Sequence, residues 1–207
     1  MDKQQHIKKF YEDNFSDYDS HMRETGHYDA QAVIISEILD ETKEPILDLA
    51  CGIGVILKLL SDKFEKLVGN DFSLPMVKAA QKETGLHITN DNAETLESHS
   101  EKYGTIICCN LFYYIQNKTE AISRWKELLD DGGHIIIIEE FPFGDPNKGK
   151  LDQQADELLK LVDPMSPEEI EATMKSQGFD LKKKVQTTID GKHDLYGSVF
   201  AIKSEEE

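Results

Sequence analysis

A short segment that combines one acid with several small residues has the composition of a ligand-binding turn. It is residues 46–54, Ile-Leu-Asp-Leu-Ala-Cys-Gly-Ile-Gly. The apolar residues predict a short buried strand around Asp48. Small residues after it would let a ligand lie directly against the backbone, namely Ala50, Cys51, Gly52 and Gly54. A pyrophosphate-binding turn needs a third glycine at the start of the helix, and Val55 and two larger residues follow instead. The segment predicts close contact with another kind of ligand, with an ordinary strand-to-helix connection as the alternative.

A second acid, Asp71, stands directly after the next predicted strand, residues 66–70. A carboxylate at this position accepts two hydrogen bonds, which suits the vicinal hydroxyls of a ribose. The alternative is that Asp71 caps the helix that follows. Because Ser73 would cap that helix equally well, we favour the ribose role.

These two sites resemble motifs of the class I S-adenosylmethionine (SAM) dependent methyltransferases. In that family an acid, small residues and Gly-x-Gly hold the methionine half of SAM, which assigns this role to residues 48–54. The pattern Asp-x-Ser-x-x-Met at residues 71–76 is similar to the second family motif. The resemblance implies that Asp71 and Phe72 contact the cofactor and that Met76 packs near its adenosine. Met76 as a plain core residue is the alternative.

A third motif falls at residues 90–96, Asn-Asp-Asn-Ala-Glu-Thr-Leu. The family commonly has Asp-Ala-Glu-x-Leu here, where the acid accepts from the adenine amino group and the next backbone N–H meets a ring nitrogen. Alignment on Ala93 places Asn92 at the position of the acid, and an amide oxygen still accepts a hydrogen bond. Asp91 would take over if the loop shifts by one residue. A plain Asx turn is the other alternative.

The end of the predicted strand 105–110 is the fourth site. In the family, a backbone carbonyl at this strand end binds the SAM amino group, which assigns that role to Asn110. Tyr113 and Tyr114 stand where relatives carry His or aromatic residues, and they would shape the pocket, stack a substrate or attract a sulfonium. Surface tyrosines at a strand end are the alternative. Tyr18, and less clearly Tyr11, resembles the aromatic residues of a family lid helix.

The order of the predicted elements indicates an α/β fold. Apolar runs alternate with helical patterns, which is typical of a parallel sheet wrapped by helices. The predicted strands are 46–49, 66–70, 86–90, 105–110, 134–139, 181–189 and 195–203, and the predicted helices between them are 55–64, 75–84, 119–129 and 166–177. A turn is predicted at residues 130–133. The resemblance implies a doubly wound, mostly parallel seven-stranded sheet with helices on both faces and an antiparallel C-terminal pair.

A single domain of residues 1–207 is predicted, in three parts. Residues 1–44 form an N-terminal helical lid, in which Ala32, Val33, Ile35 and Leu39 share one apolar face. Residues 45–140 form the cofactor-binding core. Residues 141–207 supply a substrate-side segment, with an irregular stretch at 141–150, and the last strands.

Composition and charge exclude several classes of function. The chain has a net charge of −17, so its surface repels the phosphates of nucleic acid. It has no apolar run long enough to span a membrane and no secretory signal at its N-terminus. The three cysteines, Cys51, Cys108 and Cys109, lack metal-site spacing and are expected to be reduced thiols, which favours a cytoplasmic location. We expect a monomer or a homodimer.

The predicted function is transfer of the SAM methyl group to a small molecule, because little of the chain is left to recognise a macromolecule. The sulfonium is already activated, so the protein has to align an in-line displacement and exclude water. The candidates for a catalytic group are Tyr114, His21 and Glu139, and no metal is expected. Two rivals are a SAM-binding protein without activity and a nicotinamide-dependent oxidoreductase. The missing third glycine argues against the oxidoreductase.

Overall fold

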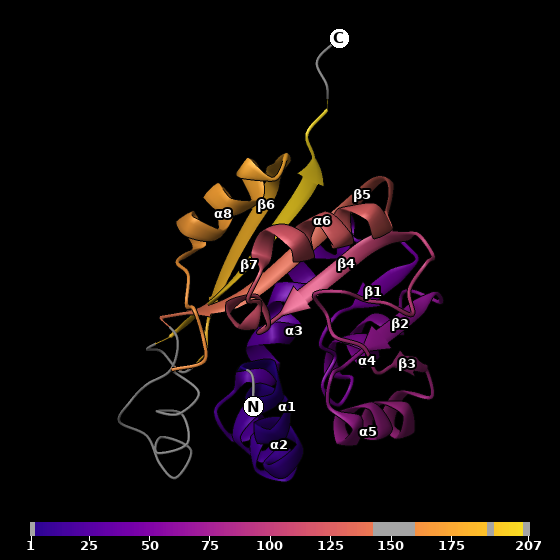
Figure 1. Ribbon diagram of the computed structural model, residues 1–207, viewed down its shortest axis with the longest axis vertical. Helices are drawn as coiled ribbons and strands as arrows, with labels where there is room; N and C mark the ends of the chain where they lie inside the picture. The colour runs from indigo at the N-terminus through magenta and orange to yellow at the C-terminus, as the bar shows by residue number, and fades with distance from the viewer. Residues whose placement is uncertain (1–2, 143–159, 190–192, 205–207) are drawn as a thin grey trace.

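The computed structural model describes residues 3–142, 160–189 and 193–204. Seven strands form one sheet in the order β3-β2-β1-β4-β5-β7-β6 (Figure 1). The strands are β1 (Ile46–Asp48), β2 (Leu67–Asn70), β3 (His87–Thr89), β4 (Tyr103–Cys109), β5 (Leu129–Phe141), β6 (Phe179–Thr188) and β7 (Asp194–Ile202). The first five pair in parallel, and β7 pairs antiparallel with both β5 and β6. The predicted seven-stranded sheet and its antiparallel end are confirmed.

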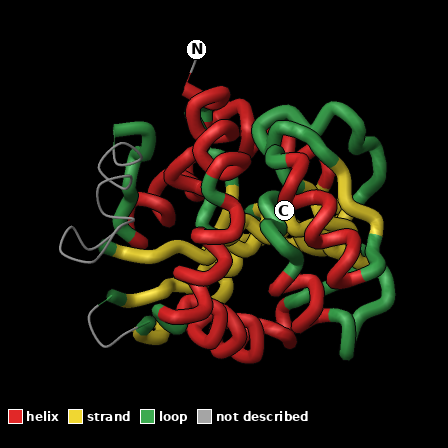
Figure 2. The backbone as a smooth tube through the Cα atoms, turned by 90° about the horizontal axis from the view of Figure 1, so that it is seen from below, coloured by secondary structure: helices red, strands yellow, loops and turns green. Residues whose placement is uncertain are grey.

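Helices cover both faces of this sheet, and Figure 2 shows the strands as a band with helices above and below it. One face is covered by α3 (His27–Ile38), α4 (Val55–Leu60) and α5 (Leu74–Thr84), whose apolar residues share one core. The other face is covered by α6 (Lys118–Leu128) and α8 (Pro167–Ser176). The isoleucines of β5 alternate between the two cores, because successive side chains of a strand point to opposite faces. The doubly wound layering follows from this alternation.

The N-terminal helices α1 (Lys3–Asp13) and α2 (Phe15–Glu24) lie at the edge of the sheet where β4 ends (Figure 1). Side chains of α1, including Ile7, Phe10 and Tyr11, pack against Tyr113 and Tyr114, which follow β4. A short 3₁₀ turn, η1 (Leu39–Glu41), connects α3 to the first strand. We call α1 and α2 the lid, because they lie over the carboxyl ends of the strands.

Two predicted boundaries are wrong. The helix α4 ends at Leu60 instead of residue 64, and a tight Lys63 N–H to Leu60 carbonyl bond begins a turn there. The predicted turn at residues 130–133 lies within β5, which begins at Leu129. Pairing with β4 jumps from Tyr103↔Leu129 to Thr105↔His134, so the extra residues bulge out of the ladder, with Gly132 at a φ of +70°.

The described residues hold no helix long and apolar enough to cross a bilayer. The three cysteines are free and buried. The predicted irregular stretch lies outside the described residues from position 143 onward.

Candidate functional site

Gly52 and Gly54, in the turn between β1 and α4, have different roles. Gly52 has a φ of +54°, and a Cβ added to it would meet no described atom within 4 Å. Gly54 has a φ of +87°, but a Cβ there would lie 2.7 Å from Thr84 Cγ2 on α5. Both therefore need glycine for backbone conformation. Only Gly52 faces open space, whereas Gly54 allows α4 to approach α5.

Two adjoining cavities meet at this turn. The larger has a volume of about 130 Å³ and the smaller about 40 Å³. Five residues line both cavities, and they are Tyr18, Ala50, Gly52, Cys109 and Asn110. The predicted residues that line only the larger cavity are Asp71, Phe72, Met76, Asn92, Ala93 and Tyr114, and those that line only the smaller are Asp48 and Cys51. Gly54, Asp91, His21 and Glu139 line neither of the two.

Of the acids predicted to bind cofactor, Asp48 and Asp71 are buried. Asp71 accepts hydrogen bonds from the backbone N–H groups of Gly52, at 2.9 Å, and Ser73, at 2.8 Å. Burial raises the pKa of Asp71 to about 6, and these bonds partly offset that effect. Neither oxygen of Asp48 has a hydrogen-bond partner among the described residues. Burial, and then the nearby charge of Asp71, raises the pKa of Asp48 to about 8.

A buried carboxylate without a partner is costly, so Asp48 suits a ligand that brings a positive charge or hydrogen-bond donors. The open space at Gly52 lets such a ligand lie along the turn. SAM has a cationic amino acid half and a ribose with two hydroxyls. The chemistry of Asp48, Gly52 and Asp71 therefore fits this cofactor.

Asp91 and Asn92 lie in the loop after β3 and have different surroundings. The Asp91 carboxylate accepts hydrogen bonds from the backbone N–H, at 2.8 Å, and the hydroxyl of Ser98, and so ties the loop together. Asn92 lines the larger cavity. Its Nδ2 donates to Gln4 Oε1 at 3.1 Å, and Gln4 Nε2 donates to Glu94 Oε1 at 2.7 Å. Of the two residues, Asn92 is the one that a ligand in this cavity can reach.

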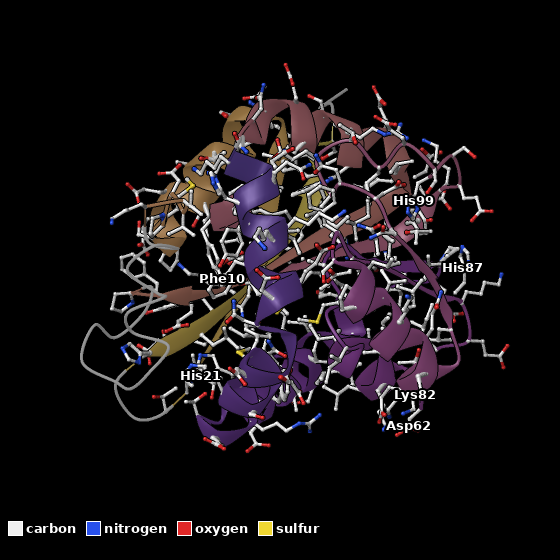
Figure 3. The ribbon with its side chains drawn as sticks, turned by 60° about the horizontal axis from the view of Figure 1, so that its bottom comes forward. Phe10, His21, Asp62, Lys82, His87 and His99 are labelled. Atoms are coloured by element: carbon white, nitrogen blue, oxygen red, sulfur yellow. The ribbon has the colours of Figure 1, made fainter. Side chains whose placement is uncertain are left out.

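Sequence reasoning missed the contribution of Gln4, Ile7 and Lys8 of α1, which also line the larger cavity. Lys8 Nζ lies 4.6 Å from the centre of the Phe72 ring. Figure 3 shows α1, with Phe10 labelled, lying across the front of the molecule. A polar N-terminal helix gives no local sign of these contacts, and only its amphipathic spacing places it against the core.

Tyrosines from the lid and from the β4 edge meet over the larger cavity. The hydroxyls of Tyr11 and Tyr114 are 2.8 Å apart, and the Tyr11 ring lies edge-on to both Tyr18 and Tyr114. Burial raises the pKa of Tyr11, Tyr18 and Tyr114 well above the ordinary value of a phenol. Because these hydroxyls stay protonated near neutral pH, they donate hydrogen bonds and do not serve as bases.

The other two catalytic candidates lie apart from the cavities. Glu139 Oε1 accepts from the backbone N–H groups of Leu111, at 2.9 Å, and Phe112, at 2.5 Å, so it holds the loop after β4 in place. Burial raises its pKa to about 8. His21 belongs to α2 (Figure 3), where its ring lies 5.9 Å from that of His27. Within the described residues, no cluster of three or more His, Cys, Asp or Glu has the arrangement of a metal site.

Comparison with known proteins relates part of the chain to methyltransferases. Residues 46–133 match the sequence model of a family described as a methyltransferase domain. An uncharacterized methyltransferase of Anoxybacillus flavithermus is 26% identical over 116 residues, which is 54% of each chain. The putative methyltransferase YqeM of Bacillus subtilis is 31% identical over 106 residues, 49% of this chain and 42% of the relative. The chain spans about half the length of the curated relatives it matches.

Two solved structures share the fold over nearly the whole chain. Magnesium protoporphyrin IX methyltransferase of Synechocystis PCC 6803, with bound SAM, has a TM-score of 0.69 and 16% identity, and the match covers 99% of this chain and 98% of that one. A SAM-dependent methyltransferase of Thermotoga maritima, described as a possible histamine N-methyltransferase, has a TM-score of 0.73 and 15% identity, with 96% and 100% covered.

The match identifies residues 46–133 as a methyltransferase domain, and the whole chain shares its fold with solved SAM-dependent methyltransferases. The family predicted from the four sequence motifs is confirmed. The cofactor of this class is SAM, and solved neighbours hold it or its product S-adenosylhomocysteine.

Proposed function

We propose that this protein binds SAM across the two cavities and transfers its methyl group to a small molecule. The observation that carries this proposal is the junction of the cavities at Gly52, flanked by the buried carboxylates of Asp48 and Asp71. The smaller cavity takes the methionine half, beside Asp48. The larger takes the adenosine, with Asp71 at the ribose and Asn92 and Ala93 at the adenine.

The carboxylate of Asp71 can serve the ribose while keeping its backbone bonds. Each of its oxygens already accepts one N–H, and an ionised carboxylate has about four acceptor sites in all. The bonds from Gly52 and Ser73 hold it in one orientation. It is therefore positioned in advance for a pair of hydroxyls.

The residues around the junction position the reactants and exclude water. SAM supplies an activated methyl group that a nucleophile displaces in line. The rings of Tyr11, Tyr18 and Tyr114 close the larger cavity from the lid side. Their protonated hydroxyls offer donors to a bound molecule without removing a proton from it.

A small methyl acceptor is supported by the lid, since α1 side chains form part of the wall of the larger cavity. The net charge of −17 disfavours a nucleic acid. A neutral or cationic molecule suits this surface better than an anionic one.

The test is methyl transfer from labelled SAM to panels of small amines, thiols, phenols and carboxylic acids, with S-adenosylhomocysteine measured by mass spectrometry. We expect at least one panel to give labelled product in step with S-adenosylhomocysteine. The variant Gly52→Val is the control that should give none. SAM binding without transfer to any of the panels would instead favour a SAM-binding protein without activity.

A further inference from the structure

Gln4 of the lid helix α1 belongs to a group of polar side chains at the end of the larger cavity proposed for the adenine. The group consists of Gln4, Asn92 and Glu94, which are far apart in the sequence. All three line the larger cavity, and each is partly exposed. The proposed function uses Asn92 for the adenine and gives no role to Gln4, although a ligand in the cavity can reach it.

The hydrogen bonds of this group determine which atom of each carboxamide faces which neighbour. The Glu94 carboxylate can only accept, and it accepts from the backbone N–H groups of Gln116, at 3.2 Å, and Asn117, at 3.1 Å. Gln4 therefore turns Nε2 toward Glu94 Oε1, at 2.7 Å, and its Oε1 accepts from Asn92 Nδ2, at 3.1 Å. Asn92 Oδ1 accepts from the backbone N–H of Glu94 at 3.0 Å, so every donor in the group meets an acceptor.

The Gln4 carboxamide keeps bonding capacity on both of its polar atoms. Among the described residues, its oxygen accepts one hydrogen bond and so has a second lone pair, and its nitrogen donates one hydrogen and so has a second. An acceptor and a donor side by side in one plane match the amino group N6 and the ring nitrogen N7 of adenine. Since Gln4 lines the cavity, this pair of atoms can serve a bound adenine.

The course of α1 along the larger cavity supports a contact with the base. Lys8, one turn after Gln4, also lines this cavity, and its Nζ lies 4.6 Å from the centre of the Phe72 ring. Phe72 directly follows Asp71, the proposed acceptor for the ribose hydroxyls. The helix therefore extends from the loop that carries Asn92 to the residue beside the ribose site, so it spans the part of the cavity assigned to the adenosine.

We propose, on the basis of the proposed function, that the Gln4 carboxamide binds the N6–N7 edge of the cofactor's adenine and so joins the lid to the base. The adenine amino group has two N–H bonds. The one beside N1 goes to Asn92, and the one beside N7 goes to Gln4 Oε1, while Gln4 Nε2 donates to N7. The lid helix thereby selects a purine that has both an amino group at N6 and a nitrogen at position 7.

A pair of ligands that differ in one atom tests this contact. They are S-adenosylhomocysteine and its 7-deaza analogue, in which a C–H group replaces N7, and the measured quantity is the ratio of their dissociation constants by calorimetry. The variant Gln4→Met keeps the length of the side chain and deletes the carboxamide. The matched control is Gln5→Met, on the next residue of α1, which is exposed and lines neither cavity. A general loosening of the lid would weaken both ligands alike and leave the ratio unchanged.

We expect the wild-type protein and Gln5→Met to bind S-adenosylhomocysteine about tenfold more tightly than the 7-deaza analogue, as for one lost hydrogen bond. Gln4→Met should bind the two ligands within about twofold of each other. A second variant, Gln4→Glu, has no N–H to donate to N7 and should lose the preference as well. Equal binding of both ligands by the wild-type protein, or an unchanged preference in the Gln4 variants, would overturn the role of Gln4 and leave the proposed function standing. Failure of the wild-type protein to bind either ligand would overturn the proposed function itself.

Discussion

Two strand ends of this sheet carry buried acids with opposite surroundings. At the end of β1, Asp48 lines a cavity and has no hydrogen-bond partner among the described residues. Near the end of β5, Glu139 accepts two backbone N–H groups through Oε1, its Oε2 has no partner among the described residues, and it lines neither cavity. Burial raises the pKa of both to about 8. A raised pKa and a position near a strand end are therefore common to both acids, whereas the cavity beside Asp48 and the backbone hydrogen bonds to Glu139 distinguish them.

The largest effect is expected at Gly52. Because an added side chain would enter the open space along the turn, Gly52→Val should weaken SAM binding at least about 100-fold, on the order of 3 kcal/mol, as for an overpacked site. Calorimetry with SAM measures this effect. The matched variant Gly54→Ala should instead lower the thermal stability through its contact with Thr84. Normal SAM binding by Gly52→Val would contradict the assignment of the turn.

The second largest effect is expected at Asp71, the proposed acceptor for the ribose hydroxyls. We expect Asp71→Ala to weaken SAM binding by about 1–3 kcal/mol, since it removes charge-assisted hydrogen bonds. Circular dichroism would show whether the variant is folded, because the bonds to Gly52 and Ser73 are lost as well. Unchanged affinity in the folded variant would show that the ribose lies elsewhere.

Variants of Glu139 and Asp48 test the contrast between these two acids. Glu139→Ala leaves the N–H groups of Leu111 and Phe112 without their acceptor and should lower the free energy of unfolding by about 1–3 kcal/mol. Asp48→Asn replaces an acid that is mostly protonated at neutral pH, because its pKa is about 8, and should leave stability nearly unchanged while it weakens SAM binding. Urea unfolding and calorimetry on both variants measure the two effects. Equal losses of stability in both would remove the distinction drawn between these acids.

The smallest effect concerns pH. Burial raises the pKa of Asp48 to about 8, well above the value near 4 of an unfolded chain, so the folded protein binds more protons between these limits. The contribution of Asp48 to stability should therefore fall as the pH rises from about 4 to 8. The affinity for SAM should rise over the upper part of this range, because a cationic ligand favours the ionised acid.

Calorimetric titrations with SAM between pH 6 and 9 measure this dependence. Asp48→Asn is the control, and its affinity should vary less with pH than that of the wild-type protein. An identical pH profile for the two proteins would show that Asp48 does not face the positive charge of the cofactor.

The sequence predicted the centre of the sheet well because β1, β4 and most of β5 are buried on both faces and appear as apolar runs. A segment that is apolar throughout does not show which of its faces is buried. In α3 the predicted face included Val33, which is 46% exposed, whereas Ile34 and Ile38 are fully buried. The run Ala32 to Ile35 is apolar throughout, so its pattern does not fix the buried side.

At the candidate site, residue type and spacing selected acids and glycines that lie near one another in the structure, but did not predict their partners. The choice between Asp91 and Asn92 depended on the hydrogen bonds of Ser98, which is seven residues beyond Asp91. The choice of Glu139 as a catalytic candidate overlooked the backbone N–H groups of the loop after β4. Gln4 bonds to Glu94, ninety residues away, and such a contact has no local signal.

The central claim is that SAM occupies both cavities, and parallel calorimetric titrations with SAM, S-adenosylhomocysteine and NADH test it most directly. We predict micromolar binding of the two adenosyl ligands with one site per chain, and no binding of NADH. Binding of NADH alone would contradict the account, because the turn at Gly52 would then hold a pyrophosphate.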